Sequence, residues 1–266
     1  MTIETHMTNA SRTAFVLKSE LADGAVALID HPVTGAFDMT DAAPVPQSAA
    51  VVASNLLAFA EGVSRQNKDD VMDSFLFASL AANKAFNPES QSQQWYAQFH
   101  KVLSTLGWLS TNWSYARYRS SHQRFTMDQA GLDILGSAIA AAALPGPASA
   151  AMLAVAGEAI KTLRESAEPL RLFDRQTKSH KGASFRIGAC AEAADGTIQL
   201  AMGAVNFHAQ SEVTHVLFWE WDSAQVETFR GEDNLVLNSR LYAQVRKAVQ
   251  DRLGNNAIAA IEEFDI

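Results

Sequence analysis

The sequence contains a single cysteine, Cys190, among 266 residues. A disulfide within the chain is therefore impossible, and a structural zinc site built on paired cysteines is excluded. The seven histidines are scattered, and none forms an HxH or HxxxH pair that would indicate a metal site. We therefore expect no metal centre in this protein.

Positive charge is also scarce. The chain has 21 Lys and Arg against 29 Asp and Glu, which gives a formal net charge of −8. A nucleic-acid-binding surface normally carries clustered Lys and Arg, and the densest positive segment here, residues 175–181, is short. We therefore expect no nucleic-acid partner.

Several familiar sequence motifs are absent. There is no GxxxxGK[ST] phosphate loop, no GxGxxG, no HExxH and no GxSxG. Residues 1–13 have neither a basic segment nor an apolar one, so we expect no Sec-type signal peptide. The protein is then expected to stay in the cytoplasm of the producing cell or to be exported by another route.

Predicted helices and strands segregate along the chain instead of alternating, which is typical of an α+β protein. We expect one domain over residues 1–266. It would comprise a helix-rich part at 48–170, an antiparallel β-meander of about four strands at 183–231, and C-terminal helices at 239–264.

Apolar periodicity places helices at residues 51–63, 71–87 and 91–107. The charged segment RQNKDD is predicted to end the first of them or to form a solvated turn. Two earlier strand-like runs, at 14–19 and 24–30, are predicted to form a hairpin. Alternating aromatic and polar residues after position 108 indicate a strand or ribbon.

Residues 134–157 contain no charged side chain. The stretch is long enough to cross a bilayer, but Pro145-Gly146-Pro147 interrupts it, and each half is too short to span alone. Alanine dominates its composition and is only weakly hydrophobic. The pattern favours an apolar helical hairpin buried in a core, and the alternative is a membrane-inserting toxin element.

Cys190 lies in a predicted strand just before Asp195-Gly196, a dipeptide typical of a two-residue hairpin turn. That turn would place Cys190 opposite Ala201 and on one sheet face with small residues. A trough of small residues predicts either a cavity that reaches the sulfur or a helix packed tightly over a small buried cysteine. The predicted cavity lining is Gly188, Ala201, Gly203 and Val205.

A cysteine nucleophile needs a base within hydrogen-bond reach. In the two-residue register, His208 lies on the sheet face opposite Cys190, which argues against it. His215 and Glu220 would lie on a neighbouring strand, so a thioesterase or acyltransferase would use Cys190, His215 and Glu220.

The segments FRIGAC (185–190), LFWEW (217–221) and QVRKAVQDRLG (244–254) together resemble the Erwinia virulence factor family of bacterial proteins. The resemblance implies association with virulence or persistence in insect guts. It also implies a palmitate-like fatty acid, bound as a thioester to a cysteine inside a hydrophobic cavity. Carried over to this chain, the acylated residue is Cys190.

The leading hypothesis is therefore a virulence-type factor with a fatty acyl chain on Cys190 and conditional association with a membrane surface. One alternative is a cysteine-dependent acyl-transfer or thioesterase enzyme. The other is a membrane-inserting toxin that uses the 134–157 hairpin.

Overall fold

The computed structural model describes residues 7–22, 45–88, 90–119, 123–142, 146–179, 182–209, 216–223, 226–254 and 260–266. Its helices are α1 (Asn9–Lys18), α2 (Arg65–Ala85), α3 (Ser92–Leu106), α4 (Met127–Ala141), α5 (Gly146–Glu165), α6 (Ala167–Thr177), the short 3₁₀ helix η1 (Val216–Phe218) and α7 (Ser239–Leu253). Its strands are β1 (Ser48–Val52), β2 (Asn55–Phe59), β3 (Trp108–Ser110), β4 (Ser114–Tyr118), β5 (Arg124–Thr126), β6 (Lys178–Ser179), β7 (Gly182–Glu192), β8 (Ile198–Ala209), β9 (Glu220–Asp222), β10 (Val226–Leu237) and β11 (Ile261–Asp265).

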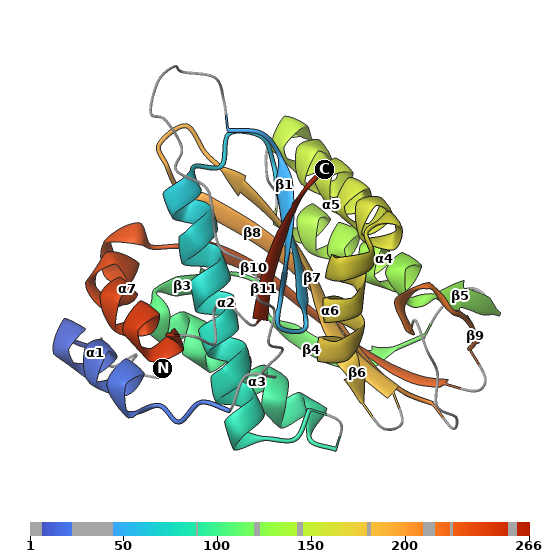
Figure 1. Ribbon diagram of the computed structural model, residues 1–266, viewed down its shortest axis with the longest axis horizontal. Helices are drawn as coiled ribbons and strands as arrows, with labels where there is room; N and C mark the ends of the chain where they lie inside the picture. The colour runs from blue at the N-terminus through green and yellow to red at the C-terminus, as the bar shows by residue number, and fades with distance from the viewer. Residues whose placement is uncertain are drawn as a thin grey trace.

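A nine-stranded sheet lies between two groups of helices (Figure 1). Its strand order is β11-β1-β2-β7-β8-β10-β3, with β4 also paired to β10 and β6 to β7. The β2–β7 pair is parallel and the other pairings described are antiparallel. A separate small sheet joins β5 to β9. This mostly antiparallel sheet with segregated helices confirms the α+β class.

Both faces of the central strands of the sheet are buried. The first face, called the α2 face below, packs with α2, α3 and α7 and includes Leu57, Cys190 and Leu200. The second, called the α4 face, packs with α4, α5 and α6 and includes Leu56 and Ala189. Neighbouring residues of one strand therefore belong to different cores, because side chains alternate across a strand.

This double burial explains one of two wrong predictions in the N-terminal half. Residues 51–63 form β1, β2 and the turns beside them instead of a helix, and both strands are buried on both faces. A strand covered on both sides is apolar throughout and lacks the alternation that marks a half-exposed strand. Residues 14–19 belong mostly to α1 instead of a strand, and 24–30 lie outside the described residues.

The charged segment RQNKDD begins a helix instead of ending one. Helix α2 starts at Arg65 and runs for 21 residues, and Lys68 and Asp70 in its first turns are buried. The predicted helix at 91–107 is confirmed as α3. It ends at Gly107, whose φ of 112° is the left-handed conformation expected of a C-terminal glycine.

The predicted β-meander is correct for three of its four strands. β7, β8 and β10 pair in that order, but the segment between β8 and β10 leaves the sheet, and its β9 pairs with β5. The predicted C-terminal helices at 239–264 consist of α7 followed by β11, an edge strand that pairs with β1. This edge pairing joins the C-terminus to the N-terminal half of the sheet.

The charge-free stretch 134–157 lies in α4 and α5, two helices that run beside each other over one face of the sheet (Figure 1). Each helix buries one side, and α5 leaves Leu153 44% exposed. Asn234 of β10 donates a hydrogen bond to the Ala138 carbonyl of α4 at 2.9 Å. Within the described residues, no helix is both long and apolar enough to cross a membrane.

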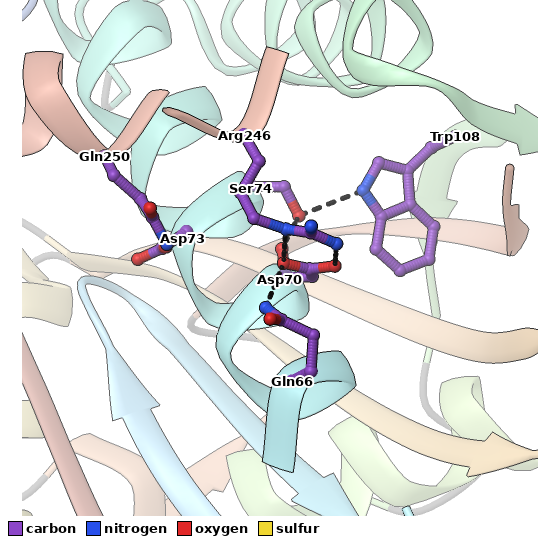
Figure 2. Close-up of polar contacts among 7 residues, drawn as sticks. All are labelled: Gln66, Asp70, Asp73, Ser74, Trp108, Arg246 and Gln250. Carbon is purple, nitrogen blue, oxygen red and sulfur yellow. Dashed lines mark hydrogen bonds and ion pairs between the residues drawn. The ribbon is translucent and has the colours of Figure 1, made fainter. Parts of the chain in front are cut away.

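A buried ion pair joins α2 to α7 (Figure 2). Arg246 donates to both carboxylate oxygens of Asp70, at 2.7 and 2.6 Å, and Gln66 donates to one of them at 3.0 Å. One turn along α2, Ser74 accepts a hydrogen bond from the indole of Trp108 at 3.0 Å. The Asp70 side chain is fully buried, so its charge depends on Arg246 for compensation.

We predict that Arg246→Met lowers the free energy of unfolding by about 3–5 kcal/mol, because it leaves the Asp70 carboxylate buried without a cation. Lys247→Met on the same helix is the matched control. Lys247 pairs with Asp251 at 2.9 Å, but both side chains are largely exposed, so its loss should cost no more than about 1 kcal/mol. Urea unfolding of the two variants makes the comparison, and equal losses would contradict the assignment.

Candidate functional site

Cys190 lies near the end of β7, and its side chain is fully buried on the α2 face. It pairs with Leu200 of β8 on one side and with Phe59 of β2 on the other. Its carbonyl accepts a hydrogen bond from the Ala60 N–H at 2.9 Å. The backbone around the sulfur is thus held on both sides by sheet hydrogen bonds.

The predicted register of this hairpin is wrong by one residue. The Ala193 N–H donates to the Thr197 carbonyl at 2.9 Å, so the loop contains three residues, 194–196, instead of two. Gly196 has a φ of 80°, the left-handed conformation that closes a three-residue hairpin loop. Cys190 consequently faces Leu200 and not Ala201.

A shift of one residue moves every side chain of β8 to the other face of the sheet. Ala201 and Val205 belong to the core on the α4 face. Gly203 lies on that face too, close to the backbone of α4. Of the four residues predicted to line a cavity, only Gly188 shares the face of Cys190. These residues do not line a common cavity, because the sheet itself separates them.

Of the predicted catalytic residues that the structure describes, Glu220 is not on a strand next to Cys190. Glu220 lies on β9, outside the main sheet, where its 61% exposed carboxylate is 3.8 Å from Arg124. His215 lies outside the described residues. By alternation His208 shares the face of Cys190, but it stands eight residues beyond Leu200 on β8, roughly 26 Å away.

Burial raises the pKa of the Cys190 thiol, and the nearby Glu192 carboxylate raises it further, whereas Lys68 acts in the opposite direction. The thiol therefore stays protonated at neutral pH. Because the thiolate is the reactive form, this cysteine is a poor nucleophile in the folded protein.

Two charged residues of this site, Glu192 and Lys68, were missed by sequence reasoning. Glu192 accepts a hydrogen bond from the Ser64 N–H at 2.8 Å, at the N-terminus of α2. Lys68 is 4% exposed, and its ammonium donates to the Pro46 carbonyl at 2.9 Å and to Ser48 at 2.7 Å. Burial lowers the pKa of Lys68. These contacts fix the first turn of α2 close to Cys190.

No group of three or more His, Cys, Asp or Glu that could hold a metal ion occurs among the described residues. Asp233 and His100 form a different pair on the α2 face, and the pKa of each is shifted. Asp233 of β10 accepts a hydrogen bond from Ser110 at 2.5 Å, and its other oxygen is 3.4 Å from Nε2 of His100. Burial raises the pKa of Asp233 to about 7 and lowers that of His100.

No protein-family model and no curated protein matches this sequence. Among solved structures, one titled delta-endotoxin matches with a TM-score of 0.40 and 14% identity, over 79% of this chain and 91% of that one. A structure of the Evf virulence factor matches with a TM-score of 0.31 and 10% identity, over 77% of each chain. Likenesses this distant assign neither a family nor a function.

The corrected register predicts different costs for two glycine substitutions. A Cβ at Gly203 would lie 2.9 Å from the backbone nitrogen of Leu135, so Gly203→Ala should cost about 1–3 kcal/mol of unfolding free energy. A Cβ at Gly188 would come closer than ordinary van der Waals contact only to the flexible end of Leu57, at 3.0 Å, while Leu200 and the Ala201 carbonyl oxygen lie at 3.6 and 3.7 Å. We expect Gly188→Ala to cost less, and urea unfolding that showed the reverse order would contradict this packing.

The Asp233 carboxyl predicts a dependence of stability on pH. Its pKa is about 7 in the folded protein and about 4 in the unfolded chain, so the folded state binds the proton more tightly. The protonated carboxyl contributes up to about 4 kcal/mol to the free energy of unfolding. That contribution is complete below pH of about 4 and is lost as the pH rises to about 7. Asp233→Asn should therefore flatten urea-derived stability across that range, and an unchanged slope would contradict the shift.

Proposed function

We propose that this protein is a virulence-type factor that carries a palmitate-like fatty acyl chain as a thioester on Cys190. The observation that supports it is the complete burial of the only cysteine within the apolar core of the α2 face. A thioester in that position is shielded from water and from competing nucleophiles. The acyl chain would extend between α2 and the sheet as part of the core.

Burial of the chain would supply the energy that keeps it inside. Each buried methylene contributes about 0.8 kcal/mol, so a long acyl chain in the core is strongly retained. A single chain released to the outside would bind a membrane only marginally. Membrane association is therefore conditional: it requires conditions that loosen α2 from the sheet.

The same burial favours acyl carriage over catalysis. A thiol with a raised pKa is rarely ionised, and its side chain is inaccessible to a substrate in solution. The sulfur could be acylated only while the first turn of α2 is displaced. Three contacts hold that turn in place: Ser64 with Glu192, Lys68 with Ser48, and Arg65 with Glu263. We therefore propose that acylation precedes the docking of α2.

Intact-mass spectrometry of the protein purified from its native host tests this proposal. We expect a mass increased by one fatty acyl group, which neutral hydroxylamine removes because it cleaves thioesters. After removal, unfolding in denaturant should expose one titratable thiol, whereas the folded protein should not react. An unmodified mass, or an adduct that resists hydroxylamine, would contradict the proposal.

Cys190→Ala, produced in the same host, is the matched variant. It keeps a small apolar side chain in the core and removes the sulfur, so we expect a single unmodified mass. An acyl adduct that persists in this variant would place the modification on another residue.

A further inference from the structure

Arg186 is a buried cation without a buried anion. It lies on β7 four residues before Cys190, on the same sheet face, and is 1% exposed. Among the described residues, no carboxylate lies within 4.0 Å of its guanidinium. Burial lowers the pKa of Arg186 to about 9. The side chain is therefore still charged at neutral pH.

Neutral groups hold the guanidinium in place. Its Nε donates to Asn55 at 2.5 Å, and one Nη donates to the hydroxyl of Ser54. The rings of Trp95 and Phe99 lie 4.2 and 4.9 Å from its central carbon. Aromatic rings compensate only part of the hydration that a buried charge loses. A negative counter-charge is what this environment lacks.

A pocket of about 150 Å³ is lined by Ser54, the hydrogen-bond partner of Arg186, while Arg186 itself lies behind Ser54 and not in the described lining. The described lining residues come from the β1–β2 turn, from the end of α2 and the segment after it, from the end of α6, and from β7 and β8, and none of them is acidic. Because Ser54 accepts from Arg186, its own hydroxyl hydrogen is free to point into the pocket. The charge of Arg186 thus strengthens Ser54 as a donor there.

Two further lining residues have buried polar atoms without a hydrogen-bond partner. Asn206 is 5% exposed; its amide nitrogen donates to the Pro88 carbonyl at 3.2 Å, but its oxygen has no partner. The buried amide nitrogen of Gln176 also lacks one. Buried polar atoms without a partner are few in native proteins, and a bound water, ion or ligand is a common explanation for them.

We propose that this pocket binds a small oxyanion, the phosphate or carboxylate group of a small ligand. The anion would accept from Ser54 and Gln176 and balance the charge of Arg186. A protonated oxygen or hydroxyl of the same ligand would donate to Asn206. A water molecule occupies about 30 Å³ in the liquid, so the pocket holds a ligand of only a few heavy atoms. The site is independent of Cys190, which lies roughly 13 Å away along β7.

Thermal unfolding in phosphate, acetate and chloride at matched ionic strength tests the proposal. A bound anion at about ten times its Kd should raise the Tm by roughly 3–6 °C, because only the folded protein binds it. A shift in phosphate alone identifies a phosphate site, and a shift in acetate identifies a carboxylate site. No shift beyond that in chloride would overturn the proposal.

Three variants assign the shift to the pocket. Arg186→Met should abolish it, and Arg117→Met, which removes an exposed arginine paired to Glu227, should leave it intact. Should Arg186→Met not fold, Asn206→Asp serves in its place. It adds a carboxylate to the pocket, which should repel the anion and abolish the shift. A full shift in Arg186→Met or in Asn206→Asp would overturn the proposal.

Discussion

The pairing of β7 with β8 determines which layer of helices each central side chain contacts. The three-residue loop that ends at Gly196 places Cys190 opposite Leu200, so Cys190 packs under α2 while Gly203 faces α4. A loop shorter by one residue would exchange the two faces of β8. The close approach of α4 to Gly203 shows that the sheet and the helix layer are fitted to this one register.

Two buried charged residues, Asp70 and Arg186, differ in how their charge is compensated. Asp70 is matched by Arg246 with two hydrogen bonds, a pairing that holds α2 against α7 (Figure 2). Among the described residues, Arg186 has only neutral hydrogen-bond partners and aromatic rings. The first arrangement is complete within the chain, and the second is completed by a ligand in our proposal.

The two proposed sites have opposite chemical character. Around Cys190 the core is apolar and the thiol stays protonated, which suits storage of an acyl group better than turnover. Around Arg186 the pocket is polar and retains unsatisfied atoms, which suits reversible binding of a small anion. Helix α2 covers both regions, since its first turn is fixed near Cys190 and its last turns reach Asn83 in the pocket.

The sequence alone determined the α+β class, the helices α3 and α7 and the break in the 134–157 stretch, because these follow from local periodicity, turn residues and composition. It could not determine that 51–63 forms strands, because burial on both faces removes alternation. The hairpin register, the anchoring of α2 by Glu192 and Lys68, and the unpaired state of Arg186 depend on contacts between residues far apart in the chain. Only the tertiary structure decided them, since local sequence carries no record of what packs against a side chain.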